Sequence, residues 1–199
     1  HSVEEEAAWA IVSEAGAGML IVSAPDGLQS VFVPVVVTDD RRTILTHVAK
    51  ANAWWRSLTN GTEVLALFLT ASAYISPSNY PSRFEHPGTV PTWNYVVTEV
   101  RGRITVHDDP EWLLHQVRLV TDQFESNRSP QWSIDDAPSE YVAQQLKAIV
   151  GIEIDVLAIQ GKAKLSQNRP GIDHDAVRDN LATGTPAERN VAAHMKNDE

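Results

Sequence analysis

The segment 46–52 carries residue types that can bind a phosphate group. It joins a stretch expected to be a strand to one expected to be a helix, and it holds a hydroxyl (Thr46), an imidazole (His47) and an amine (Lys50). Backbone N–H groups at the start of a helix, aided by such side chains, can hold a phosphate. The alternative is a threonine cap beside a solvated lysine. Spacing alone favours that alternative, because neither glycine-rich phosphate-loop pattern occurs in the sequence.

A second polar segment, 164–169, follows an apolar stretch in the last quarter of the chain. It contains Lys164, Gln167 and Arg169, whose side chains could reach into a pocket and bind anionic or amide groups. The same residues also describe an ordinary charged turn. Taken alone, the segment favours the turn.

The segment 73–95 combines aromatic residues with prolines. The rings and prolines are Tyr74, Tyr80, Trp93 and Tyr95, with Pro77, Pro81, Pro87 and Pro91. Proline cannot donate a hydrogen bond to a β-ladder, so the middle of this segment is expected to be a loop and not a central strand. Long irregular loops in compact domains are usually functional or disordered, and the aromatic content argues against disorder. Two interpretations remain open: a loop that covers the end of a barrel, or a loop that contacts a ligand.

Several kinds of catalytic site are excluded or unsupported. The chain has no cysteine, which removes disulfides, zinc–thiolate sites, iron–sulfur clusters and thiol nucleophiles. The seven histidines form no HExxH motif, and the cluster 173–175 (Asp-His-Asp) reads as a solvent-exposed polar loop. A hydrolase of the GxSxG type is also unsupported. We therefore predict no metal site and assign no catalytic residue.

The charge of the chain bears on its partners. The formal net charge is −10, and the basic residues are scattered and form no tract. A DNA-binding surface needs clustered Lys and Arg, so direct DNA binding is not expected. No apolar run approaches the length of a membrane span. The lack of cysteine fits a reducing compartment, and we expect a cytoplasmic protein without a membrane partner.

Hydrophobic periodicity predicts the elements that position these segments. We expect a first helix that begins at a Ser2 capping box and ends at Gly16, and a β-hairpin over 19–37 that turns at 25–27. Strands are expected over 43–48, 64–69, 94–107 and 152–156. Helices are expected over 50–60, over 110–124 with one apolar face, and over 138–149 with a stop at Gly151, and a polar helical region is expected after 171. Five or six strands joined mostly by hairpins, without a βαβ rhythm, predict an α+β fold that is mainly β. We expect an antiparallel barrel or sandwich with peripheral helices.

Four segments together resemble the PaiB-like FMN-binding family. They are 46–52, 73–81, 90–95 and 161–169, and the resemblance covers nearly the whole chain. Members of this family are often described as negative transcriptional regulators. The resemblance implies an antiparallel split β-barrel of the FMN-binding type over 1–170, with 171–199 as a C-terminal helical extension of the same domain. It also implies a homodimer that binds FMN in a cleft at the subunit interface.

The resemblance also implies roles for individual residues. Those expected at the FMN phosphate are Thr46, His47, Lys50 and Asn52; those on the strand along the isoalloxazine edge are Val33 and Pro34; those approaching the cofactor, within one subunit or across the interface, are Trp93, Asn94, Gln167 and Arg169. The family more often has Arg at Lys50, Pro at Ala53 and Trp at Asn79. Lysine supplies charge without the bidentate fork of arginine, which predicts a weaker hold on phosphate.

Three functions follow as hypotheses. The first is a flavin-binding regulator that acts as a sensor or through protein contacts. The second is a flavin-dependent oxidoreductase that uses FMN and NAD(P)H, in which the cofactor carries the chemistry and no acid or base motif is required. The third is a dimeric interaction module without cofactor, suggested by the departures at Lys50, Ala53 and Asn79.

Overall fold

The computed structural model describes residues 1–85 and 88–195. Pro87 of the aromatic segment and the last four residues of the expected C-terminal extension lie outside this range. Contacts divide the chain into two compact units: unit 1 comprises 1–15, 68–98 and 160–199, and unit 2 comprises 16–67 and 99–159. The proposed division into a 1–170 domain and a helical extension stays a prediction.

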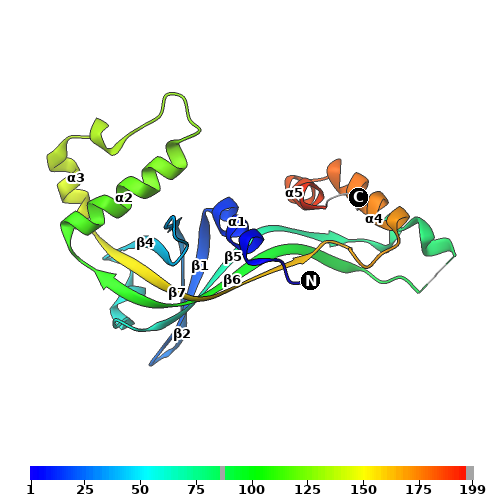
Figure 1. Cartoon of the computed structure of the whole chain (residues 1–199), viewed down its shortest axis with the longest axis horizontal. Coiled ribbons are helices and arrows are strands. Elements are labelled where there is room, and N and C mark those ends of the chain that lie inside the picture. Colours follow the sequence, from blue (N-terminus) through cyan, green and yellow to red (C-terminus); the bar gives the residue numbers. More distant parts are fainter. Residues whose placement is uncertain (86–87, 196–199) are drawn as a thin grey trace. The chain divides into compact units, whose positions relative to one another are not determined.

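One antiparallel sheet contains seven strands in the described part of the chain, in the order β2-β1-β5-β6-β7-β4-β3 (Figure 1). The strands are β1 (Ala17–Ala24), β2 (Gly27–Pro34), β3 (Val36–Val37), β4 (Thr43–Ala49), β5 (Glu63–Ile75), β6 (Thr92–His107) and β7 (Ile149–Lys164). The helices are α1 (Glu5–Ala15), α2 (Pro110–Glu125), α3 (Ser139–Leu146), α4 (Gly171–Ala182) and α5 (Pro186–His194). The predicted mainly β, antiparallel fold with peripheral helices is confirmed, with more strands than expected.

Unit 2 is built on the predicted hairpin and on the pairing of β4 with β7. The hairpin of β1 and β2 closes at Ala24↔Gly27, where Gly27 adopts a φ of +119° that favours glycine. Strand β4 pairs antiparallel with β7 from Thr43↔Asp155 to Ala49↔Ile149. Most of the buried side chains of these two strands are aliphatic, such as that of Ile44. This core holds the end of β4, and therefore the candidate phosphate segment, on a rigid strand.

Helix α2 starts where the sequence predicts. The Asp109 carboxylate accepts a hydrogen bond from the Trp112 N–H (2.8 Å), and Pro110 occupies the first turn. The Trp112 ring stacks on His107, with centroids 4.1 Å apart. A Cβ on Gly151 would lie 2.1 Å from this ring, so Gly151 makes room for Trp112. Gly151 lies inside β7, so the prediction that it ends a helix is wrong.

Unit 1 packs helices against the ends of three strands. Its core includes residues from α1, β5, β6, α4 and α5, such as Ile11, Ile75, Val177 and Val191. The polar C-terminal region is helical, as predicted, and each of its two helices contributes buried side chains to this core. No described helix has the length and apolar character that a membrane crossing requires.

Several predicted boundaries are wrong. The expected helix over 50–60 is a five-residue 3-10 helix, η1 (Ala53–Ser57), which ends because Leu58 returns to extended backbone. The helix expected over 138–149 ends at Leu146, because Ile149 begins the pairing of β7 with β4. The strand expected over 64–69 continues to Ile75. Among the described residues the loop is therefore confined to 76–85 and 88–91, and it contains η2 (Pro77–Asn79) and η3 (Pro81–Phe84).

Candidate functional site

The predicted site residues fall into two groups. Val33, Pro34, Thr46, His47, Lys50 and Asn52 belong to unit 2, whereas Trp93, Asn94, Gln167 and Arg169 belong to unit 1. Within unit 2 the structure brings the end of β2 to β4.

Thr46 joins the two strands of the unit 2 group. Its side chain is fully buried, and its hydroxyl donates a hydrogen bond of 2.6 Å to the Pro34 carbonyl. Val33, next to Pro34, is also buried. The Thr46 hydroxyl therefore ties β4 to the end of β2. In this arrangement its proton is committed to the backbone, so its first role is to fix the strand that carries the segment.

His47 follows Thr46 on the strand and therefore projects from the opposite face of the sheet. Its Nδ1 lies 2.8 Å from the side-chain oxygen of Gln116, a fully buried residue of α2. The Gln116 amide nitrogen is buried and has no hydrogen-bond partner among the described residues. Sequence analysis missed Gln116, because it lies 69 positions from His47 on a helix face that was read as apolar.

Lys50 is the cation of this segment. Its ammonium lies 2.5 Å from a carboxylate oxygen of Asp108, and a third of its side chain is exposed (33%). Asn52 is exposed, and its side-chain oxygen caps η1 by accepting a hydrogen bond from the Trp54 N–H (3.0 Å). The long helix that would offer free backbone N–H groups at this point is therefore replaced by a short 3-10 helix that Asn52 caps. Among the four residues predicted at the phosphate, Lys50 is the one that carries a partly exposed ammonium.

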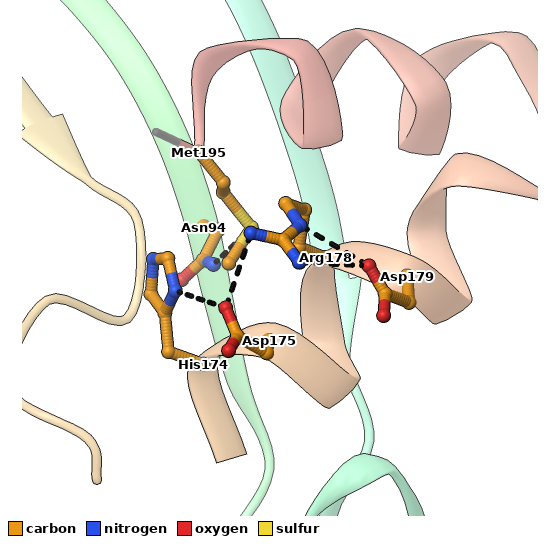
Figure 2. Close-up of polar contacts among 6 residues, drawn as sticks. All are labelled: Asn94, His174, Asp175, Arg178, Asp179 and Met195. Carbon is orange, nitrogen blue, oxygen red and sulfur yellow. Dashed lines mark hydrogen bonds and ion pairs between the residues drawn. The ribbon is translucent and has the colours of Figure 1, made fainter. Parts of the chain in front are cut away.

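In unit 1, Asn94 is a structural residue. It is fully buried, and its amide nitrogen donates to Ser166 Oγ (3.0 Å). The same nitrogen approaches the sulfur of Met195 (4.0 Å), as Figure 2 shows. Ser166 has a φ of +64°, an uncommon value for a residue with a side chain. Gln167 folds onto its own turn, accepting from the Leu165 N–H and donating to the Ala163 carbonyl. These contacts shape the 164–169 segment.

Trp93 and Arg169 present aromatic and cationic groups. Trp93 is half exposed and its ring lies 6.1 Å from that of Tyr74, which is also half exposed. The Arg169 guanidinium lies 4.4 Å above the ring of Tyr80. Tyr80 is fully buried, and its hydroxyl has no partner among the described residues. Tyr80 of the loop therefore belongs to the core, whereas Tyr74 at the end of β5 and Trp93 at the start of β6 form an accessible aromatic pair.

The Asp-His-Asp cluster is not the exposed loop that the sequence suggested. It lies in the first turn of α4, where Asp173 is fully buried and accepts from both the backbone N–H (3.0 Å) and the hydroxyl (2.6 Å) of Ser82. Figure 2 shows Arg178 between Asp175 and Asp179. Its guanidinium nitrogens lie 3.1 Å from a carboxylate oxygen of Asp175 and 3.0 Å from one of Asp179. The hydrogen bond from Arg178 to Asp179 raises the pKa of the guanidinium. The cluster anchors the loop at η3 and is a structural device.

The two groups offer different kinds of contact. Unit 2 offers a partly exposed ammonium suited to a phosphate, and unit 1 offers an exposed aromatic pair suited to a planar ring. No two of the ten predicted residues form an acid–base pair with each other. The chemistry that these residues support is binding and orientation.

Comparisons with known proteins identify the family of the chain. A family model described as "Putative FMN-binding domain" matches residues 1–158. Protease synthase and sporulation protein PAI 2 of Bacillus subtilis is 30% identical over 178 residues, which cover 88% of this chain and 83% of that protein.

Two solved structures share the fold. The FAD and heme binding protein from Mycobacterium smegmatis has a TM-score of 0.59 at 13% identity, covering 92% of this chain and 79% of that one. The flavocytochrome Anf3 from Azotobacter vinelandii has a TM-score of 0.60 at 9% identity, with coverage of 81% and 67%. The predicted split-barrel class is confirmed.

Proposed function

The chain belongs to the PaiB-like FMN-binding family, and from this premise we propose that it is a homodimeric flavoprotein whose FMN-bound state regulates other proteins or genes. The observation that carries the proposal is the family match together with an exposed ammonium, that of Lys50, at the end of β4. The name of the Bacillus relative refers to protease synthesis and sporulation, which suits a regulatory role. We place the protein in the cytoplasm, because a chain without cysteine suits a reducing compartment.

Different residues of the chain would bind different parts of FMN. Lys50 would neutralise the phosphate, with Thr46 fixing the backbone of β4 beneath it. Trp93 and Tyr74 would pack against the flavin ring, and Arg169 could pair with an anionic group. A second copy of the chain could supply one of these groups, which is why we propose a dimer. Bound FMN would supply the capacity for hydride or electron transfer.

Regulation through direct DNA contact is disfavoured by the charge. A net charge of −10 repels a polyanion, and the regulatory action is therefore proposed to pass through protein contacts. A gel-shift titration at moderate salt measures this directly. Tight, sequence-selective DNA binding would overturn the indirect route.

The second candidate function is a flavin-dependent oxidoreductase. The observation in its favour is the shared fold with the flavocytochrome and with the FAD and heme binding protein, whose names refer to redox cofactors. Oxidation of NADH or NADPH by the FMN-loaded protein discriminates between the two functions. Turnover would favour the enzyme, and no turnover with either nucleotide would favour the regulator.

The experiment that tests the shared premise is a visible absorbance spectrum of the purified protein before and after FMN is added and the excess removed. Retained flavin bands support the proposal, and light scattering on the same sample gives the oligomeric state. A protein that does not retain FMN would instead favour the third hypothesis, a dimeric interaction module without cofactor.

A further inference from the structure

A cavity of about 440 Å³ lies in unit 2. The side chains proposed for the flavin ring, Tyr74 and Trp93, do not line it. It is lined by α3, by η4 (Ile134–Asp136) and by the adjoining ends of β4 and β7. We propose that this cavity binds a small planar aromatic molecule that carries one N–H or O–H donor. The inference assigns His47 to this cavity and not to the FMN phosphate, and it does not depend on FMN binding.

Most of the cavity wall is apolar. Val117, Ile134, Val142, Leu146 and Ile149 line it, together with three alanines. Such a wall favours a ligand that transfers little polar surface from water. The volume lies in the lower part of the range for small-molecule sites, which suits a molecule of one or two rings.

Two aromatic side chains indicate that the ligand is planar. Trp132 and Tyr141 line the cavity, yet they are 46% and 56% exposed. Large rings that are half exposed at a cavity are positioned to stack on a flat ligand, and aromatic pairs gain free energy beyond the area that they bury. A flat ring system would cover both.

His47 supplies the polar contact. Its Nδ1 is held by the fully buried oxygen of Gln116 at 2.8 Å, and an oxygen can only accept, so Nδ1 carries the proton. In the neutral ring Nε2 is then an acceptor. Since His47 lines the cavity and Nδ1 is occupied, Nε2 is the ring atom left for a ligand. The other polar groups on the wall are the Gln145 amide, the Tyr141 hydroxyl and the Trp132 N–H, and all three residues are exposed to solvent. His47 therefore provides the acceptor, and we expect the site to favour a ligand that places a donor against it.

Isothermal titration of the full chain with indole and with 1-methylindole tests this selection. The two probes have nearly the same shape, but only indole has an N–H. We expect saturable 1:1 binding of indole and about tenfold weaker binding of 1-methylindole, the effect of one hydrogen bond. In Gln116→Leu, which removes the partner that orients His47, the preference for indole should fall to about twofold. Equal affinity for the two probes in the unmodified protein would overturn the polar recognition.

A matched pair of variants on α3 locates the site. Val142→Trp fills the cavity and should abolish indole binding, whereas Gln144→Trp places the same ring on the exposed side of the helix and should preserve it. Circular dichroism melting shows whether each variant folds. Should Val142→Trp fail to fold, loss of indole preference in Gln116→Leu still tests the site. Indole binding that survives in a folded Val142→Trp protein would overturn the proposal.

Two further outcomes identify a different occupant. Indole affinity should be the same with and without saturating FMN; competition would place the flavin in this cavity and overturn a separate site. Light scattering on Val142→Trp and Gln144→Trp should give the same mass. A loss of dimer in Val142→Trp only, with no indole binding by the unmodified protein, would show that a second copy of the chain covers the cavity.

Discussion

The ammonium of Lys50 lies 2.5 Å from a carboxylate oxygen of Asp108, so the cation proposed for the FMN phosphate is already paired within unit 2. Lys50 follows β4, and Asp108 lies between β6 and α2. Because Asp108 is two-thirds exposed (66%), the pair is accessible to solvent and to an incoming anion. A bound phosphate would therefore compete with this carboxylate for the same ammonium.

The first prediction concerns Asp108. Asp108→Asn removes the competing charge, and we expect the dissociation constant for FMN to fall by about threefold, in line with the modest strength of exposed ion pairs. Quenching of FMN fluorescence measures it. Asp122→Asn, an equal change of charge at an exposed position of α2, is the control and should have a smaller effect. Weaker FMN binding by Asp108→Asn would contradict a competitive role.

The second prediction concerns Lys50 itself. Lys50→Ala should weaken FMN binding by about tenfold or more, because a charge-assisted hydrogen bond to phosphate is lost. The free energy of unfolding in urea should change by less than about 1 kcal/mol, since the ion pair with Asp108 is exposed. Lys50→Arg keeps the charge and should bind FMN at least as well as the unmodified protein. Unchanged affinity in Lys50→Ala would remove Lys50 from the site.

Local pattern was enough to predict much of the fold. The first helix, the hairpin that turns at 25–27, β4 and the long strand that ends at His107 all have clear periodicity or turn residues. Prediction was wrong where a tertiary contact overrides local preference. Gly151 reads as a helix stop, but its role is to accommodate the ring of Trp112. The segment 50–60 has helical spacing, yet Asn52 caps a turn of five residues.

The candidate site was less accessible to sequence reasoning. Residue types at 46–52 indicated anion binding, but the partners that decide each role are distant in the chain. Gln116 holds His47 from 69 positions away, and Ser166 holds Asn94 from 72. A sequence without aligned relatives contains no signal for such pairs. The structure therefore separates residues that sequence analysis treated alike: Asn94 is buried and structural, whereas Lys50 presents an exposed charge.

The third prediction concerns the contact between Thr46 and Pro34. Thr46→Val keeps the shape of the side chain but leaves the Pro34 carbonyl without its donor, so we expect a loss of about 1–2 kcal/mol in the free energy of unfolding. Thr46→Ser retains the hydroxyl and is the matched control. Urea denaturation measures both. If Thr46→Val proves as stable as the unmodified protein, the hydrogen bond does not hold the two strands.

The fourth prediction concerns acid stability. The hydrogen bonds from Arg118 lower the pKa of Asp135 below its usual 3.8. A carboxyl whose pKa is lowered in the folded state stabilises the fold above its usual pKa, and this contribution is lost as the pH falls through the lowered value. We expect Arg118→Met to lower the melting temperature at pH 6 and to have less effect at pH 2.5. Equal effects at both pH values would show that the pair contributes nothing through charge.

The fifth prediction concerns the anchor between Asp173 and Ser82, which fixes the aromatic loop to α4. The buried Asp173 carboxylate accepts both the backbone N–H and the hydroxyl of Ser82, so Asp173→Ala should cost about 2–4 kcal/mol of unfolding free energy. Ser82→Ala removes one of the two donors and should cost about 1–2 kcal/mol. Hydrogen exchange followed by mass spectrometry should show faster exchange over η2 and η3 in both variants.

The Ser82 and Asp173 variants also separate an anchoring role from a binding role. If the loop orders the aromatic pair of Tyr74 and Trp93, Ser82→Ala should weaken FMN binding even though Ser82 is not proposed to touch the cofactor. Ser78→Ala is a suitable control, because the Ser78 hydroxyl hydrogen-bonds to that of Ser76, the N-cap of η2, and not to Asp173. Faster exchange in Ser82→Ala with unchanged FMN affinity would show that the anchor stabilises the fold alone, and that the loop does not position the flavin.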